Sequence, residues 1–281
     1  MSPLWRDEVG VYLSPHRLCL VRLRRGARPK VAAEHEQRLE NPAGDSWEAA
    51  LEAFASVLRE PSWGGTPTRV VLADHWVRYI IVPWVGALRS EEERLAHGRQ
   101  LLNSAYGDAI ANWDMRISDA PPGHPRVACA VPGELIAAVR AACTAHGASL
   151  LSLQPQLIDA YATWRQRLPN SKSWFVSIEP GSLAAARLGR NGWDRVHSVR
   201  IGADWKRELR RLQTFGRLAG SSPEEGQVYV DAPLAWREVA GNTADGSDIS
   251  GLQWLEEPDA PAPGAAESSR AHPAPRATAV R

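Results

Sequence analysis

Residues 174–200 read WFVSIEPGSLAAARLGRNGWDRVHSVR. Three apolar runs are separated by two tight turns, EPG at 179–181 and GRNG at 189–192. Short turns that contain Gly or Asn between apolar runs are typical of β-hairpins. The stretch therefore predicts a three-stranded β-meander.

A second stretch of the same kind lies about 165 residues earlier. Apolar runs at 9–13, 18–23 and 31–37 are again separated by short turns. A helical pattern follows each of the two meanders, and such self-similarity is typical of a duplicated fold. We therefore expect an α/β protein of two lobes, each with a mixed sheet flanked by helices.

The expected boundaries follow from these patterns. Residues 1–153 form the first lobe, with an inserted subdomain at about 69–125, and residues 154–240 form a second, reduced lobe. Residues 241–281 are rich in Ala and Pro and have few large apolar side chains. Such a segment cannot bury enough apolar surface to offset the entropy of ordering, so we expect a disordered tail.

Short sequence motifs indicate where two of the helices begin. Asp45 with Glu48 and Ser90 with Glu93 have the spacing of capping boxes, in which each residue satisfies a backbone N–H of the other. Apolar residues at helical spacing also predict a helix over 155–168.

Composition narrows the class of protein. A net charge of +1, with 44% apolar and 23% charged residues, is typical of a soluble globular chain and gives no general attraction to nucleic acid. Cys19, Cys129 and Cys143 all lie in apolar runs, which favours buried, reduced thiols in the cytosol. An apolar run of about 18 residues is absent, so we expect no membrane span.

The familiar catalytic motifs are absent: the P-loop, G-x-G-x-x-G, C-x-x-C, H-E-x-x-H and G-x-S-x-G. Cys143 and His146 are three residues apart on an expected helix, a spacing that permits the thiol–imidazole pair of a thiol hydrolase, although a thiol beside an Ala/Val face is usually there for packing. The histidines show no metal-ligand spacing. The residues therefore predict no catalytic site and no metal site.

A helix expected from Asp204 to about Ala219 has a basic face. Its basic residues are Lys206, Arg207, Arg210, Arg211 and Arg217. Such a face is either simply solvated or contacts an acidic partner or anionic lipid head groups.

Three segments carry a resemblance to a known family. They are VGVYLSPHRLCLVR at 9–22, RVVLADHWVRYIIVPWVGALRSEEERLAHGR at 69–99, and VACAVPGELIAAVRAACTAHGASLLSLQPQLIDAYATW at 127–164. Their order is similar to that of the actin-like ATPase superfamily, which has a duplicated, RNase H-like fold. More specifically, it resembles the PilM/GspL-type assembly proteins of type IV pili and type II secretion.

This resemblance implies a degenerate nucleotide site. In actin-like ATPases the first phosphate loop has an Asp for magnesium and a Gly for close backbone approach; here Tyr12 and Ser14 hold those positions, followed by Pro15. The second loop, normally D-x-G, aligns on Ser177 and Glu179, and Glu179 would place negative charge against a phosphate. We therefore expect a pseudo-ATPase with neither ATP nor magnesium as cofactor.

The resemblance also implies a partner. In this family a groove in the first lobe binds the cytoplasmic N-terminal tail of a bitopic inner-membrane protein of PilN type. A non-catalytic scaffold of this kind would be cytoplasmic and peripheral to the membrane, and self-association stays open. The alternative is an active actin-like nucleotide-dependent enzyme, an ATPase or a kinase. Candidate contacts are Trp76, Tyr79 and Trp84, which core packing would explain equally well, and Glu91 and Glu92.

Overall fold

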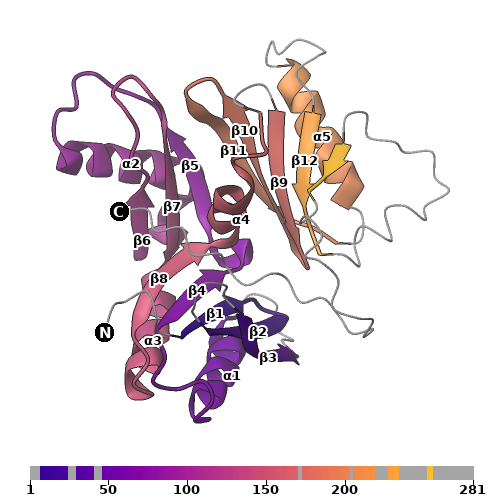
Figure 1. Cartoon of the computed structure of the whole chain (residues 1–281). Coiled ribbons are helices and arrows are strands. Elements are labelled where there is room, and N and C mark those ends of the chain that lie inside the picture. The colour runs from indigo at the N-terminus through magenta and orange to yellow at the C-terminus, as the bar shows by residue number, and fades with distance from the viewer. Residues whose placement is uncertain are drawn as a thin grey trace.

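The structure is a computed structural model that describes residues 7–24, 30–40, 46–169, 173–202, 205–218, 227–233 and 252–255. Figure 1 shows two lobes, each built on a five-stranded sheet, and a smaller three-stranded sheet beside the first lobe. Helix α4 lies between the lobes.

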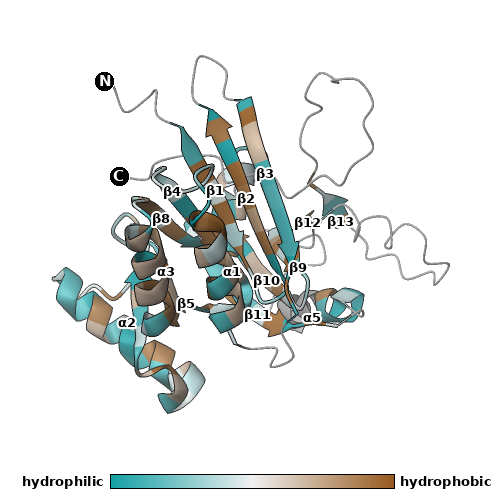
Figure 2. Ribbon diagram, turned by 90° about the horizontal axis from the view of Figure 1, so that it is seen from below, coloured by the Kyte–Doolittle hydropathy of each residue, from teal (hydrophilic) through white to brown (hydrophobic). Residues whose placement is uncertain are grey.

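The first lobe has the strand order β3-β2-β1-β4-β8. Its strands are β1 (Glu8–Leu13), β2 (Arg17–Arg24), β3 (Lys30–Arg38), β4 (Thr68–Leu72) and β8 (Leu150–Pro155). Helices α1 (Glu48–Leu58) and α3 (Gly133–Ala145) cover one face of this sheet (Figure 2), with Phe54 and Leu135 fully buried beneath them. Strand β3 is the largely hydrophilic edge of the sheet.

The second lobe repeats this arrangement with the order β11-β10-β9-β12-β13. Its strands are β9 (Ser173–Glu179), β10 (Ser182–Gly189), β11 (Gly192–Arg200), β12 (Gln227–Asp231) and β13 (Leu252–Trp254). In both sheets the first three strands are antiparallel and the last two run parallel to the first. The same order and polarity in both lobes confirm the predicted duplication.

The insert lies between β4 and α3. It consists of η2 (Asp74–Trp76), β5 (Arg78–Val82), α2 (Glu91–Tyr106), η3 (Gly107–Ile110), β6 (Trp113–Ile117) and β7 (Arg126–Pro132). Its sheet has the order β5-β7-β6, so β4, which the sequence analysis placed in the insert, belongs to the first-lobe sheet. The predicted capping box is present: the Ser90 hydroxyl accepts from the Glu93 N–H, and the Glu93 carboxylate accepts from the Ser90 N–H.

Helices α4 (Gln156–Trp164) and α5 (Trp205–Leu218) complete the second lobe. The Tyr161 ring of α4 packs edge-on against Trp193 and Phe175, with ring centroids 4.9 and 5.8 Å apart. One hydrophobic core therefore extends from the first lobe through α4 to the inner face of the second sheet.

Three local predictions were wrong. The N-cap of α1 is Trp47, which has no side-chain cap, and Asp45 lies outside the described residues. Helix α4 ends at Trp164 rather than 168, and Pro155 ends β8. Within the expected disordered tail, residues 252–254 form β13, which pairs with β12 and brings Trp254 against Trp205. The rest of 241–281, apart from Leu255, lies outside the described residues.

Candidate functional site

The β1–β2 and β9–β10 turns, which the resemblance aligns with phosphate loops, lie beside each other where the two lobes meet. The β1–β2 turn contains Ser14 to His16, and the β9–β10 turn contains Pro180 and Gly181. A Cβ atom on Gly181, whose φ is +87°, would lie 3.6 Å from His16 Nε2. The two turns therefore lie close together, with no room for a large side chain between them.

A hydrogen bond joins the strands that lead into these turns. The Tyr12 hydroxyl, at the end of β1, donates to Glu179 Oε1, at the end of β9. Both residues are buried, with exposed fractions of 6% and 4%. Two of the four residues that the sequence analysis aligned with the nucleotide loops thus bind each other.

The second Glu179 oxygen extends this contact. Glu179 Oε2 accepts from the Asp74 N–H at 2.8 Å and from the Ser182 hydroxyl at 3.0 Å. Glu179 therefore links β9 of the second lobe both to its own hairpin and to the segment that follows β4 of the first lobe.

Asp74 is the other centre of the network. Its Oδ1 accepts from the Tyr79 hydroxyl of β5 and, at 3.2 Å, from the Leu157 N–H in the first turn of α4. Its Oδ2 is buried without a hydrogen-bond partner among the described residues. The Tyr12–Glu179–Asp74–Tyr79 network, called the inter-lobe latch below, joins the first lobe, the insert, α4 and the second lobe.

Burial controls the electrostatics of the latch. It raises the pKa of Glu179, an effect that the hydrogen bonds from Tyr12, Asp74 and Ser182 partly offset. Burial and then the Glu179 charge raise the pKa of Asp74 well above its usual range. Burial likewise raises the pKa of both tyrosines, which keeps their hydroxyls protonated as donors.

These residues do not fit a magnesium–nucleotide. A phosphate at this point would meet a buried carboxylate where a backbone N–H cradle is needed, and like charges repel strongly in a site with little water. The Ser14 hydroxyl is engaged within its own turn: it donates to the Arg17 carbonyl at 2.8 Å and accepts from the Arg17 N–H at 3.0 Å. Ser177 is buried, and its Oγ has no hydrogen-bond partner in the described part of the chain.

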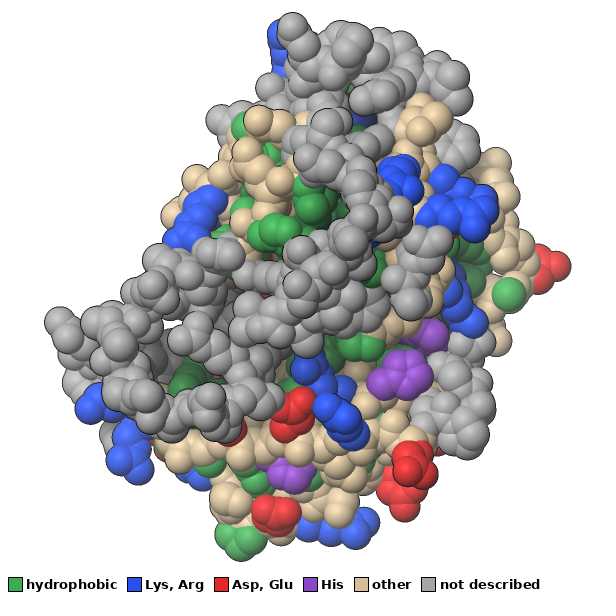
Figure 3. All heavy atoms as spheres, turned by 90° about the vertical axis from the view of Figure 1, so that its right-hand side faces the viewer, with side chains coloured by type: hydrophobic (Ala, Val, Ile, Leu, Met, Phe, Trp, Pro, Cys, Tyr) green, Lys and Arg blue, Asp and Glu red, His purple; other side chains and the backbone are tan. Residues whose placement is uncertain are grey.

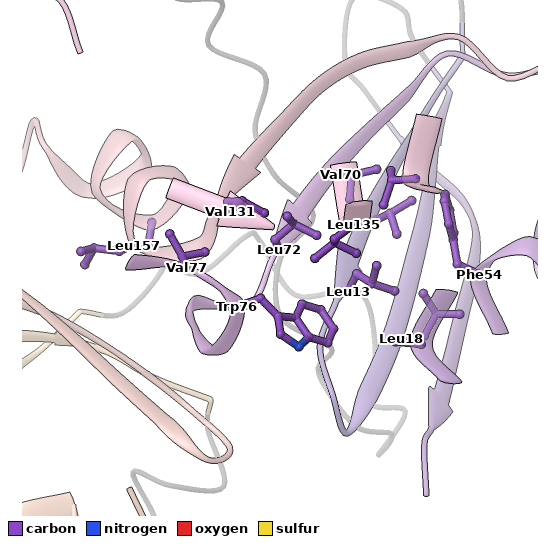
Figure 4. Packing of buried hydrophobic residues seen from close by; sticks show 14 of the residues in the cluster. Leu13, Leu18, Phe54, Val70, Leu72, Trp76, Val77, Val131, Leu135 and Leu157 are labelled. Atoms are coloured by element: carbon purple, nitrogen blue, oxygen red, sulfur yellow. The ribbon is translucent and has the colours of Figure 1, made fainter. Parts of the chain in front are cut away.

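Two of the proposed partner-binding aromatics lie in the core, which corrects the sequence analysis. Trp76 and Tyr79 have exposed fractions of 3% and 2%. Figure 4 shows Trp76 within the cluster that includes Leu13 and Leu72. A side chain so enclosed cannot anchor a partner from solvent without local opening.

Of the other three candidates, Trp84 lies between β5 and α2, and Glu91 and Glu92 lie in the first turn of α2. Trp84 is partly exposed, and Glu91 and Glu92 are exposed. A small groove here is lined by Val82, Pro83, Trp84, Val85, Leu88, Arg94, His124 and Arg126. The Arg94 guanidinium lies 5.7 Å from the Trp84 ring centroid, and Arg126 pairs with Glu91 at 3.2 Å. The groove thus combines an apolar wall with a charged rim.

The Cys143–His146 pair does not have the properties of a nucleophile. The Cys143 side chain is buried in the first-lobe core, and burial raises the pKa of its thiol to about 11. A reactive thiol needs the opposite shift.

Sequence reasoning missed Asp74 and a second acidic pair, Asp159 with Asp231. Asp159, in the first turn of α4, faces Asp231 at the end of β12; burial first, and then the Asp231 charge, raise the pKa of Asp159 to about 6. Asp231 is the last residue of the parallel strand β12, and Asp74 lies two residues beyond the end of the parallel strand β4. An acidic residue at or just beyond the end of a buried strand was the sequence signal that could have identified both residues.

The comparisons with known proteins are structural. The chain is similar to a PilM–PilN type IV pilus biogenesis complex (15% identity, TM-score 0.61, 88% of each chain covered). It is also similar to the cytoplasmic domain of EpsL, an inner-membrane component of the type II secretion system of Vibrio cholerae (11% identity, TM-score 0.55, 81% and 83% covered). A third neighbour is a Bacteroides thetaiotaomicron protein with an actin-like ATPase fold and unknown function (13% identity, TM-score 0.57, 86% and 89% covered).

These similarities confirm the expected actin-like, two-lobed fold. No family model and no curated protein matches the sequence. None of the helices in the described part of the chain has the length and apolarity that crossing a bilayer requires. In the same part of the chain, His, Cys, Asp and Glu side chains nowhere gather in groups of three suited to a metal ion.

Proposed function

We propose that this chain is a non-catalytic scaffold of an inner-membrane assembly platform of the type IV pilus or type II secretion kind. The inter-lobe latch is the observation that carries the proposal. Where an actin-like ATPase holds magnesium and phosphates, Tyr12 and Glu179 bind each other in a buried contact. The two neighbours from pilus and secretion systems, each similar over more than four-fifths of this chain, support the platform.

The proposed partner is a bitopic membrane protein of PilN type, bound through its cytoplasmic N-terminal tail. The PilM–PilN neighbour supports the choice of partner. The groove at the start of α2 is the proposed surface, because Trp84 provides an accessible aromatic anchor beside exposed charges.

Site-specific crosslinking tests the partner. A photoreactive amino acid in place of Trp84, in cells that contain the membrane assembly proteins, should trap a single-span membrane protein by its N-terminal tail. Trp84→Ala, combined with Glu92→Lys, should reduce co-purification of that protein. The matched control is Glu134→Lys, because Glu134 is also exposed near the start of a helix but lies on α3. A partner captured equally well by all variants would place the contact elsewhere.

The alternative function, an active nucleotide-dependent enzyme, can be distinguished from the scaffold by a binding measurement. It requires magnesium-dependent nucleotide binding, for which the latch would have to open. A magnesium–ATP titration of the full chain, followed by thermal unfolding, separates the two functions.

A further inference from the structure

The exposed face of α5 is a cationic surface. Trp205 and Leu209 point into the second-lobe core, with exposed fractions of 2% and 1%. Arg207, Arg210 and Arg211 lie on the opposite side at spacings of three and four residues, and all three are exposed. The helix therefore buries its apolar side against the sheet and presents arginines to solvent.

One carboxylate offsets this charge within the described part of the helix. Glu208 forms an ion pair with Arg211 at 2.9 Å. Arg207 and Arg210 stand outside this ion pair, and both are exposed. Lys206 adds a further cation beside Trp205, with its Nζ 5.8 Å from the ring centroid. Figure 3 shows the molecule from the side of the second lobe, with Lys and Arg side chains scattered over this face and one group of them at the upper right. The Arg217 side chain lies outside the described residues.

The chemistry of this face indicates its partner. Protein interfaces are anchored by aromatic and large apolar side chains, whereas the described exposed positions of α5 are Arg207, Arg210, Arg211 and Thr214. A row of long, flexible cations without an apolar anchor suits a surface of many mobile negative charges. Anionic lipid head groups provide such a surface, and basic side chains near it contribute additively.

We propose that the Arg207–Arg210–Arg211 face of α5 binds anionic lipid head groups at a membrane surface. The contact is electrostatic and peripheral, because Trp205, the large apolar residue of the helix start, is buried and cannot insert. This lipid contact goes beyond the proposed scaffold function and does not depend on which membrane protein is the partner. Binding by this face alone is weak and reversible, so it orients the second lobe toward the membrane rather than anchoring the chain.

Vesicle co-sedimentation of the full chain tests this proposal. The probes are vesicles of phosphatidylcholine mixed with phosphatidylglycerol and, as the neutral control, vesicles of phosphatidylcholine alone. We expect binding to the anionic vesicles only, and its loss as salt is raised toward about 1 M, where the Debye length falls to ~3 Å. Each arginine should contribute roughly fivefold to the partition coefficient.

Variants locate the contact. Arg207→Glu with Arg210→Glu should lower the partition coefficient by at least about twentyfold, and Arg207→Gln with Arg210→Gln by a smaller factor in the same direction. The matched control is Arg99→Glu with Arg140→Glu, which changes the net charge equally at exposed helix positions of α2 and α3. Circular dichroism verifies that each variant folds, as expected for exposed sites.

Three results would overturn the proposal. The first is no binding of the wild-type chain to anionic vesicles. The second is an equal loss in the control pair, which would indicate general charge. The third is binding of a polyglutamate peptide or duplex DNA that depends on Arg207 and Arg210 while vesicles are ignored, which would assign the face to an acidic protein or to nucleic acid.

Discussion

Removing one hydroxyl should weaken the closure of the two lobes. Tyr12→Phe deletes the donor to Glu179 Oε1 and leaves the rest of the ring in its buried position. Because Glu179 is only 4% exposed, water cannot replace the lost donor. A hydrogen bond to a charged group contributes about 1.5–3 kcal/mol, so we expect the free energy of unfolding to fall by that amount.

A double-mutant cycle isolates this contact. In a Glu179→Leu background the acceptor is already gone, so Tyr12→Phe should then cost less than about 0.5 kcal/mol, which gives a coupling energy of about 1–2.5 kcal/mol. The measurement is urea unfolding followed by tryptophan fluorescence and circular dichroism, whose transitions must coincide for the free energies to be valid.

Tyr229→Phe is the matched control. The Tyr229 hydroxyl donates to Gln227 at 2.8 Å, but that bond is exposed. Its loss should change stability by no more than about 0.5 kcal/mol. Equal costs for Tyr12→Phe in the two backgrounds, or a cost no larger than that of the control, would refute the latch as a stabilising contact.

Further predictions concern pH, packing and the thiol. Burial raises the pKa of Asp159 from 3.8 to about 6, so the native state binds the extra proton and stability should fall as pH rises from about 4 to about 6. Asp159→Asn should flatten that part of a pH–stability profile and stabilise the protein by about 1–2 kcal/mol at neutral pH, a reduced figure because the carboxyl is partly exposed; an unchanged slope would contradict this. Gly64→Ala should destabilise by about 1–3 kcal/mol in thermal unfolding, because its Cβ would lie 2.8 Å from the backbone carbonyl oxygen of Leu58, while Gly86→Ala, with 3.8 Å to its nearest neighbour, should cost less. Iodoacetamide should leave Cys143 unmodified in the folded protein, as mass spectrometry can check, and rapid labelling would mean that the thiol is accessible and acidic.

Much of the fold was predictable because its signals are local. The turns of the second meander lie where Gly and Pro interrupt the apolar runs, and the Ser90–Glu93 capping box is fixed by residues three apart. The duplication of the fold followed from the repeated meander. Each of these features depends on residues close together in the chain.

The latch was not predictable because its partners are distant in sequence. Tyr12 and Glu179 are 167 residues apart, and the Asp74 N–H and Glu179 are 105 apart. Both loop positions were identified by resemblance, but the sequence indicated only what they had lost and not that they bind each other. Their contact depends on how the lobes close.

The errors have a similar cause. Trp76 and Tyr79 have the composition of an interface, yet the junction of η2, β5 and α4 encloses them. Strand β13 is only three residues long in a polar segment, and pairing with the exposed edge of β12 orders it. Tertiary context decided both cases.

The most direct test of the central claim is a thermal-shift titration of the full chain with magnesium–ATP. A ligand that binds the native state raises its stability, by ~2.7 kcal/mol at about a hundredfold excess over the dissociation constant. We predict no shift at millimolar nucleotide, for the wild-type chain and for Tyr12→Phe alike. A magnesium-dependent shift in the wild-type chain would contradict the pseudo-ATPase account and would favour an active nucleotide-dependent enzyme.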